Sequence, residues 1–204
     1  MIIQTPEFLR AEFFMRDETP KPSDISPRQV HGKNIIVVDS ENLSRYALPE
    51  RPEADGVLLT TKNISASLRF ADCAPVMIYG SEWVMLLHSG YKGTVLNISG
   101  YGLELVNNAM GAWVGPCIGR EYCRDINDEW TQKGMRAFHR ENYDVNGDKV
   151  YFDLAGEIRI QLTEAGLDEE NITLSGINTL TSPECYSYRR GDIKERMTLH
   201  IRML

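Results

Sequence analysis

Long apolar runs are absent from this sequence of 204 residues. Its longest apolar stretch, Trp83 to Leu87, has the length of one strand, whereas a membrane-spanning helix needs about 20 apolar residues. The opening segment, Met1 to Arg16, mixes charged and apolar side chains and lacks the apolar region of a secretory signal peptide. We therefore expect a cytoplasmic protein that does not associate with membranes.

An excess of basic residues is also absent, because 29 acidic residues outnumber 22 lysines and arginines and leave a net charge of −7. Sequence-independent binding of nucleic acid needs a basic face, so we expect no nucleic-acid partner. A small local group of basic residues can still bind a phosphate. The four cysteines are spread along the chain, and in a reducing cytoplasm they predict free thiols rather than a disulfide framework.

The composition that is present is typical of a globular protein, with 42% apolar and 25% charged residues, and the length suits one domain over residues 1–204. Apolar and β-branched runs predict strands at 34–38, 56–61, 67–79, 82–87, 110–114, 171–174 and 197–203. Apolar periodicity predicts helices at 94–108, 125–140 and 154–165, the last capped by Asp153. Interleaved strands and helices, with a hairpin turn at Gly80 and Ser81, predict an α/β mixed (α+β) fold with mixed sheets flanked by helices.

Three short segments contain the residues from which we expect chemistry. In the first, Gln29-Val30-His31-Gly32, a histidine lies beside a turn glycine. Considered alone, this segment is also typical of an ordinary loop.

The second segment, Ala71-Asp72-Cys73-Ala74-Pro75-Val76, places a cysteine in the middle of a predicted strand. Proline cannot donate a hydrogen bond to the sheet, so we expect the strand to bulge or end at Pro75 and to expose side chains there. A buried core cysteine is the other interpretation, although Asp72 argues against a wholly apolar setting.

In the third segment, Leu87 to Thr94, an apolar strand leads through His88 into a glycine-rich turn and a helix start. Strand ends of this kind often carry functional groups, and a helix start with Lys92 nearby favours an anion. An ordinary strand-to-helix loop would look similar. Counted outward from the Gly80-Ser81 turn, Cys73 and His88 lie at similar distances, so we expect them to be neighbours across a hairpin. A thiolate with two imidazoles suits zinc or copper.

These segments resemble the laccase-domain family, also called the YfiH/YlmD family, whose pattern runs QVHG, ADC-x-P, HAGWRG, GPxIG and SYRR. The matching segments here lie in the same order, at 29–32, 71–76, 88–93, 115–119 and 187–190. The resemblance implies a single YfiH-like domain with a metal pocket. It implies that His31, Cys73 and His88 are the ligands of zinc, with copper as the other suitable metal.

The resemblance also implies phosphorolysis of adenosine, inosine and S-methyl-5′-thioadenosine with inorganic phosphate, and adenosine deamination as a further activity. For this reaction we expect Cys73 and His88 to take part in catalysis. We expect Lys92, Arg69 and Arg189 to bind phosphate, together with the helix start after His88. The third motif departs from the family, because Tyr91 and Lys92 stand where the family usually has Trp and Arg. Lys92 would meet phosphate as a point charge, and Tyr91 can still stack on a base.

Other functions stay open at this point. A thiol hydrolase with Cys73 as nucleophile and His88 as base is the main alternative, and editing of cell-wall precursors is one such reaction. Weak copper-dependent oxidation of polyphenols and metal binding without catalysis are two others. The oligomeric state is not predicted.

Two enzyme classes are excluded. A multicopper oxidase needs more histidines than the four present, namely His31, His88, His139 and His200. A cytidine-deaminase-type zinc enzyme needs H-x-E followed by P-C-x-x-C. Here His139-Arg140-Glu141 follows Pro116-Cys117 instead of preceding it, and the next cysteine, Cys123, is too far along. We expect structural roles for Cys117, Cys123, His139, His200 and Arg190, and expect Cys185 to line the pocket.

Overall fold

The computed structural model describes residues 1–204 and is built around a six-stranded sheet in the order β11-β7-β5-β6-β3-β2. In chain order its strands are β2 (Ile35–Val38), β3 (Gly56–Leu59), β5 (Ala74–Tyr79), β6 (Val84–Ser89), β7 (Gly111–Val114) and β11 (Ile172–Leu174). The two outer pairs are parallel and the central pairs are antiparallel. The sheet is therefore mixed, as the interleaved pattern predicted.

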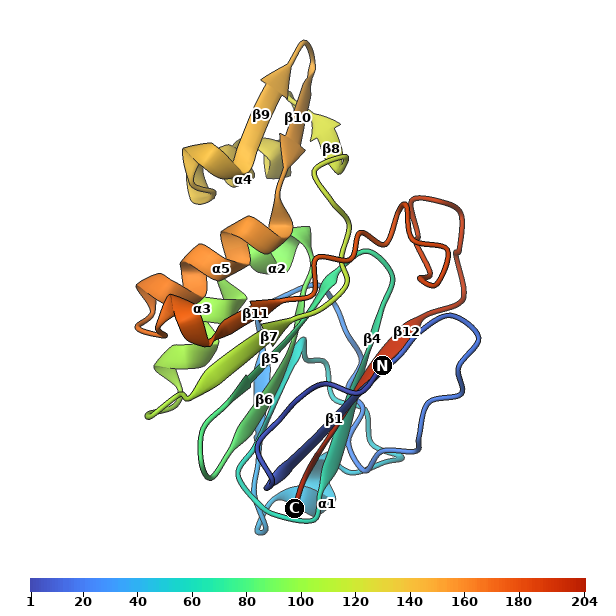
Figure 1. Cartoon of the computed structure of the whole chain (residues 1–204), viewed down its shortest axis with the longest axis vertical. Helices are drawn as coiled ribbons and strands as arrows, with labels where there is room; N and C mark the ends of the chain where they lie inside the picture. The colour runs from blue at the N-terminus through green and yellow to red at the C-terminus, as the bar shows by residue number, and fades with distance from the viewer.

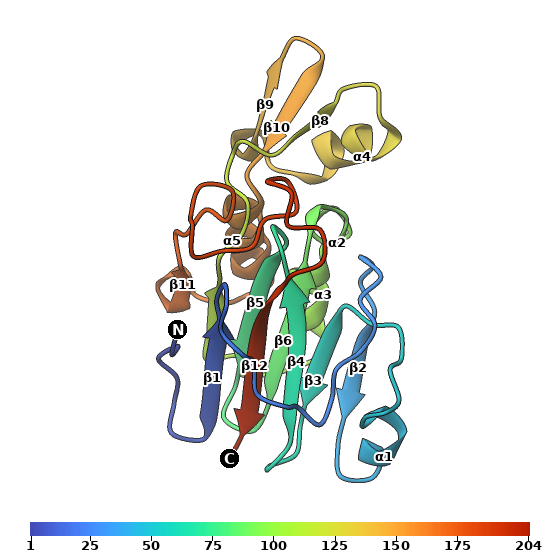
Figure 2. The ribbon, with the colours of Figure 1, turned by 90° about the vertical axis from the view of Figure 1, so that its right-hand side faces the viewer.

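A second sheet packs against one face of the first, and helices cover the other face (Figures 1 and 2). This antiparallel sheet has the order β1-β12-β4, with bounds Leu9–Phe14, Met197–Met203 and Ser65–Phe70. The covering helices are α2 (Tyr91–Val95), α3 (Ile98–Glu104) and α5 (Leu154–Glu164), while α1 (Leu43–Tyr46) lies at the far end of the molecule. None of the helices combines the length and the apolar character that a membrane span requires.

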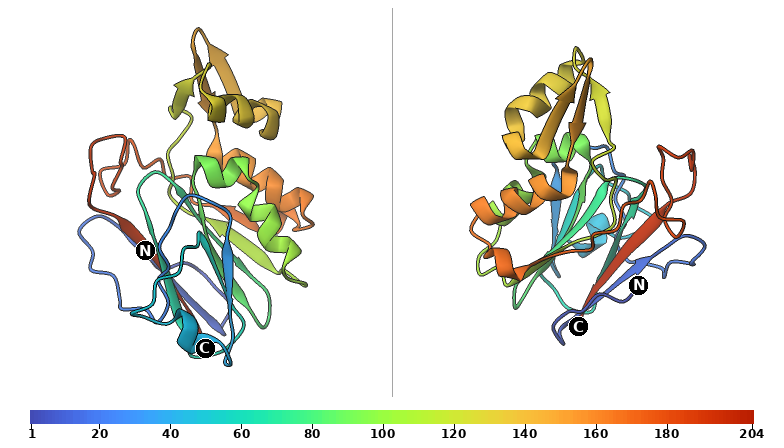
Figure 3. Two further views of the ribbon diagram at one scale, coloured as in Figure 1. Left: turned by 180° about the vertical axis from the view of Figure 1, so that it is seen from behind. Right: turned by 45° about the horizontal axis from the view of Figure 1, so that its top comes forward.

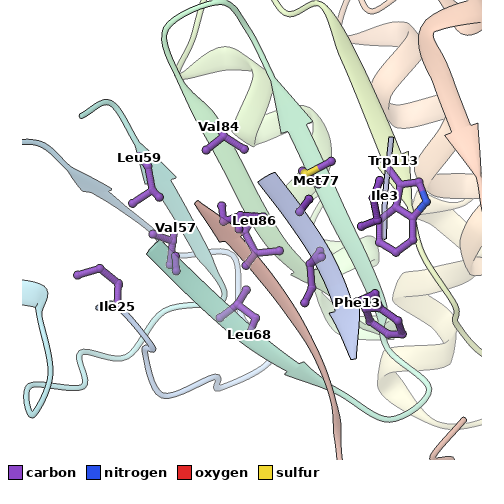
Figure 4. Packing of buried hydrophobic residues seen from close by; sticks show 14 of the residues in the cluster. Ile3, Phe13, Ile25, Val57, Leu59, Leu68, Met77, Val84, Leu86 and Trp113 are labelled. Atoms are coloured by element: carbon purple, nitrogen blue, oxygen red, sulfur yellow. The ribbon is translucent and has the colours of Figure 1, made fainter. Parts of the chain in front are cut away.

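Alternate residues of the central strands enter two separate hydrophobic cores. Val57, Leu59 and Leu86 belong to the core between the two sheets (Figure 4), whereas Leu58 and Leu87 belong to the core beneath the helices. Successive side chains of a strand point to opposite faces, so a strand covered on both faces must be apolar throughout. This explains why these strands form continuous apolar runs in the sequence.

A small third sheet projects beyond the end of the central sheet, together with α4 (Glu129–Ala137) (Figures 1 and 3). Its order is β8-β10-β9, with bounds Cys123–Asp125, Lys149–Phe152 and Tyr143–Asn146. None of these strands was predicted from the sequence, and neither was β1. The β9–β10 turn contains Asn146-Gly147, a common hairpin pair, and Gly147 has a φ of +59°. Short 3₁₀ helices span Arg140–Asn142 and Glu169–Asn171.

Two predicted elements are each divided into two in the structure. The single strand at 67–79 is two strands, β4 and β5, which belong to different sheets. The chain breaks at Asp72, whose φ is +79°, rather than at Pro75, which lies inside β5 opposite His88. The single helix at 94–108 is divided into α2 and α3 at Asn97, which is left-handed and accepts a hydrogen bond from the Gly100 N–H.

Most other predicted elements are confirmed. The strands near residues 34–38, 56–61, 82–87, 110–114, 171–174 and 197–203 correspond to β2, β3, β6, β7, β11 and β12. The predicted cap of α5 is present, because Asp153 accepts a hydrogen bond from the Gly156 N–H. Helix α4 is shorter than the predicted 125–140, since Asp128 caps its start.

Candidate metal centre

Three side chains from distant parts of the chain meet at one end of the central sheet, where β6 leads into α2 (Figure 2). Cys73 lies in the break between β4 and β5, and His88 lies on β6. The β5–β6 pairing puts Pro75 opposite His88 and so brings Cys73 beside it. His31 comes from the loop before β2. The nitrogen and sulfur atoms that these three residues offer lie within 4.8 Å of one another.

A buried carboxylate that the sequence analysis missed holds two of these residues in place. Asp55, immediately before β3, accepts hydrogen bonds from the backbone N–H groups of Val30, His31 and Gly32 at 3.2, 2.9 and 2.7 Å. Its Oδ1 also lies 2.8 Å from His88 Nδ1. Asp55 is fully buried, so this one side chain fixes both the His31 loop and the ring of His88.

The strained backbone at His31 depends on this arrangement. His31 has a φ of +61°, a left-handed conformation that is uncommon for residues other than glycine. Three N–H donors around one carboxylate compensate for that strain. Because His88 Nδ1 is used by Asp55, its Nε2 is left to face Cys73.

Charges in this cluster support one another. Burial opposes ionisation of the Cys73 thiol, but the nearby positive charge of His88 and hydrogen bonds with His31 and His88 outweigh burial and lower its pKa to about 6. Burial likewise opposes protonation of His88, but Cys73 and Asp55 outweigh it and raise the imidazole pKa to about 9. Cys73 is therefore prepared to act as a thiolate, the form that binds metal and acts as a nucleophile.

The donor set fits a metal ion in chemistry and in approximate geometry. One thiolate and two imidazoles are ligands that suit zinc or copper. Tetrahedral zinc holds its nitrogen and sulfur ligands about 3.5 Å apart. The corresponding atoms here lie within 4.8 Å of one another, somewhat wider than in a zinc-bound site but grouped around one point.

Gly90 makes room for the sulfur. A Cβ atom at this position would lie 2.5 Å from Cys73 Sγ and 3.6 Å from His31 Cδ2. Any side chain at residue 90 would therefore displace the thiolate. This is a close-approach glycine, required by the position of the sulfur rather than by backbone conformation.

The cluster lies in the wall of a cavity of about 750 Å³. Its lining includes six arginines and one lysine but only one carboxylate, Asp72, although the whole chain is acidic. Asp72 is engaged with the chain, since it accepts hydrogen bonds from the Thr179 hydroxyl and the Arg189 N–H at 2.7 and 2.8 Å. The cavity is thus strongly positive and suited to anions.

The three residues expected to bind phosphate all line this cavity. Lys92 is exposed, and its Nζ lies 4.9 Å from the centre of the Trp130 ring. Arg189 donates one hydrogen bond to the Cys123 carbonyl and stacks over Tyr122. The guanidinium of Arg69 makes no hydrogen bond within the chain. Helix α2 has only five residues, so its N-terminus contributes less to anion binding than the sequence analysis expected.

Tyr91 is enclosed rather than free to stack. Its ring packs against Tyr122, Phe138 and Phe152, and its hydroxyl donates to the Trp130 carbonyl at 2.9 Å. Only 6% of Tyr91 is exposed. Its ring therefore supports the cavity wall, and Tyr188 is the more accessible aromatic residue in the lining.

The other residues singled out in the sequence lie outside the cavity lining. Arg190 donates to the carbonyls of Thr179 and Ser182 and pairs with Asp192. Cys185 was expected to line the pocket, but it is buried in the core between the two sheets and does not reach the cavity. The remaining residues, Cys117, Cys123, His139 and His200, also lie outside the cavity lining.

Comparison with known proteins gives a consistent family assignment. The family model described as multi-copper polyphenol oxidoreductase laccase matches residues 10–203. A purine nucleoside phosphorylase of Aquifex aeolicus is 31% identical over 156 residues, which cover 74% of this chain and 72% of the relative. The purine nucleoside phosphorylase YlmD of Bacillus subtilis is 30% identical over 158 residues, covering 69% and 55% of the two chains.

Solved structures share the fold. The hypothetical protein YfiH of Bacillus licheniformis has a TM-score of 0.77 at 24% identity and covers 88% of this chain and 74% of its own. The Neisseria meningitidis protein NMB0706 has a TM-score of 0.81 at 17% identity and covers 100% and 98% of the two chains. The expected YfiH-like mixed α/β fold is confirmed.

Proposed function

This chain belongs to the multi-copper polyphenol oxidoreductase laccase family, and we propose that it is a metal-dependent purine nucleoside phosphorylase. The observation that carries this proposal is the convergence of His31, Cys73 and His88 in the wall of a cavity rich in arginine. A metal ligand set supplies a reactive centre, and the positive lining supplies a place for phosphate. Relatives named purine nucleoside phosphorylase add support.

Phosphorolysis transfers a ribosyl group from a purine to phosphate. An oxygen of inorganic phosphate forms a bond to C1′ of the ribose while the bond from C1′ to the purine nitrogen breaks. The electron pair of that bond leaves with the purine, which then takes up a proton. The transition state carries positive charge on the sugar, as in other glycosyl transfers.

Each part of the proposed site has a task in this reaction. Lys92, Arg69 and Arg189 hold the phosphate anion, since the cavity offers no free carboxylate to repel it. Cys73 and His88 are proposed as catalytic groups, because both line the cavity that would hold the nucleoside and its departing purine. His31, Cys73 and His88 would hold the metal, zinc or copper, which supplies a Lewis acid when bound.

Adenosine, inosine and S-methyl-5′-thioadenosine are the proposed substrates, and deamination of adenosine is proposed as a further activity. The proposed setting is the cytoplasm, where phosphate and nucleosides are available. The chain has one cluster of candidate metal ligands, and it consists of three residues. A cluster of this size accommodates one ion rather than several.

A thiol hydrolase is the second candidate, favoured by the lowered pKa of Cys73 beside His88. The two candidates differ in their need for phosphate. A phosphorylase releases ribose 1-phosphate and stops when phosphate is withheld, whereas a hydrolase proceeds with water alone.

The test is incubation of the purified, zinc-loaded protein with adenosine, with and without phosphate, with analysis of adenine, ribose 1-phosphate and inosine. The informative variant is Cys73→Ala, and the matched control is Cys123→Ala, a half-buried free cysteine outside the cavity lining. We expect phosphate-dependent adenine release that is lost in Cys73→Ala and retained in Cys123→Ala. Adenine release that is unchanged in Cys73→Ala would refute the site, and release without phosphate would favour the hydrolase.

A further inference from the structure

The cavity is lined by two groups of cations that come from different parts of the fold. The sheet-side arginines are Arg51, Arg69 and Arg196, located in the loop before β3, on β4 and next to the start of β12. The helix-side cations are Lys92, Arg124 and Arg189, located on α2, on β8 and in the loop before β12. Strands β4 and β12 belong to the sheet that covers one face, and α2 lies on the other face (Figure 1).

The sheet-side arginines are held together by the backbone. Arg51 donates from Nε and Nη2 to the carbonyls of Ser26 and Pro27, in a segment that pairs with β4 through Ile25 and Ala66. The backbone N–H and C=O of Arg69 are both bonded to the side chain of Gln29, in the His31 motif. Arg196 donates to the carbonyls of Asp192, Ile193 and Glu195. These contacts fix the side chains of Arg51 and Arg196 and the backbone of Arg69 without supplying a negative charge.

Their positive charges have no counterpart in the chain. None of the three sheet-side arginines forms an ion pair, whereas Arg28, another residue of the lining, is paired with Glu53. Burial, and after it the neighbouring positive charges of Arg196 and Arg51, lower the pKa of Arg69, because the three guanidinium groups lie near one another. Their mutual repulsion is unfavourable unless an anion is bound.

We propose that the cavity binds two phosphate groups at once, and that the second is carried by the substrate. The helix-side cations hold the inorganic phosphate that attacks C1′, and the sheet-side arginines hold a phosphate on the 5′ oxygen of the nucleoside. The preferred substrate class is therefore purine nucleoside 5′-monophosphates. This inference rests on the proposed function and reassigns Arg69 from the attacking phosphate to the phosphate of the substrate.

Charge and size agree with this assignment. Each phosphate group brings about −1.5 to −2 charges near neutral pH, and two of them match the cations of the lining better than one. The cavity of about 750 Å³ is in the upper part of the usual range for small-molecule sites. The reaction remains balanced: a phosphate oxygen bonds to C1′, the bond to the purine breaks, and free purine and ribose 1,5-bisphosphate are formed.

The test compares adenosine with adenosine 5′-monophosphate as ligands and as substrates of the zinc-loaded protein. Equilibrium binding and kcat/KM are measured for the wild type and for Arg51→Gln and Arg196→Gln. The control is Arg45→Gln, which removes one unpaired positive charge from α1, outside the cavity lining. Arg51→Lys keeps the positive charge of residue 51 but removes the guanidinium group, so it distinguishes the effect of charge from that of side-chain geometry. Thermal unfolding verifies that each variant is folded.

We expect the wild type to bind the monophosphate about 10- to 100-fold more tightly than adenosine. In Arg51→Gln and Arg196→Gln this preference should fall by roughly tenfold, while Arg45→Gln and Arg51→Lys should retain most of it. Equal affinity for the two ligands in the wild type, or a preference that survives both glutamine substitutions, would overturn the proposal.

The outcomes also separate this inference from the proposed function. The monophosphate could bind tightly through the arginines while no purine is released in the presence of phosphate. That result would support the second phosphate site and refute the proposed phosphorylase activity. If the protein turns over adenosine and shows no preference for the monophosphate, the proposed phosphorylase activity stands and the second phosphate site is refuted.

Discussion

Asp55 Oδ1 lies 2.8 Å from His88 Nδ1, and both side chains are closed off from solvent. A histidine ring held at one nitrogen by a carboxylate presents the other nitrogen in a fixed direction. The same carboxylate accepts the N–H of His31, so two of the three proposed ligands depend on one side chain.

Replacement of Asp55 should therefore weaken metal binding without removing any ligand. We expect Asp55→Asn to bind zinc about 10- to 100-fold more weakly than the wild type, as measured by competition with a chelator. The control is Asp39→Asn, whose carboxylate accepts N–H bonds in an unrelated turn before α1. Wild-type zinc affinity in Asp55→Asn would contradict the positioning role.

The close approach of Gly90 to Cys73 predicts a strong effect of a single methyl group. In Gly90→Ala the new Cβ would meet Sγ at 2.5 Å, so the thiolate must move. We expect loss of stoichiometric zinc binding, together with a destabilisation of about 1–3 kcal/mol from overpacking. Gly32→Ala is the matched control in the opposite loop, because its Cβ would lie 3.6 Å from Asp55 Oδ2, an ordinary contact. Equal zinc content in the two variants would argue against a fixed sulfur position.

The free energy of unfolding should depend on pH through His139, whose ring contacts Glu157 and Glu164 on α5. Hydrogen bonds and charge attraction from Glu157, with a further contribution from Glu164, raise the pKa of His139 above its ordinary value of about 6.5. A group with a raised folded-state pKa stabilises the fold fully below the unfolded value, and this contribution is lost as pH rises through the folded value. The difference in unfolding free energy between wild type and His139→Gln, measured in urea, should decrease as pH rises. A difference that does not vary with pH would contradict this linkage.

The packing of the two sheets can be tested by the stability of variants in the core between them, which does not involve the proposed metal centre. Leu86 is fully buried there (Figure 4), so Leu86→Ala should reduce the free energy of unfolding by about 2–5 kcal/mol. Val37, which is 40% exposed on β2, provides a control, and Val37→Ala should cost less than about 1 kcal/mol. Similar losses in both variants would mean that the two sheets pack more loosely than described.

The sequence could predict the proposed ligands because each lies in a short motif with a local signal. His31, Cys73 and His88 are marked by turn glycines, a proline and a strand end within a few residues. Asp55 carries no such signal, since its partners are 23 to 33 residues away and only tertiary structure brings them together. Arg51 and Arg196 were missed for the same reason, because isolated arginines in loops are usually surface charges.

Errors in the fold also have physical causes. The run at 67–79 is mostly apolar, and periodicity alone cannot show that the chain passes from one sheet to another at Asp72. The strands β8, β9 and β10 are short and partly exposed, so they lack the apolar alternation that reveals longer strands. The Asn146-Gly147 pair was the one local signal of that hairpin.

The break at Asp72 connects the two sheets directly through the residues next to Cys73. One end of that crossing is anchored in β4 and the other in β5, opposite His88. Any sliding of one layer over the other would therefore carry the sulfur away from the imidazole before either sheet unravels. Binding of the proposed metal would then depend on the alignment of the two layers, and we expect substitutions that loosen β1 or β12, far from the cavity, to weaken zinc binding before the chain unfolds.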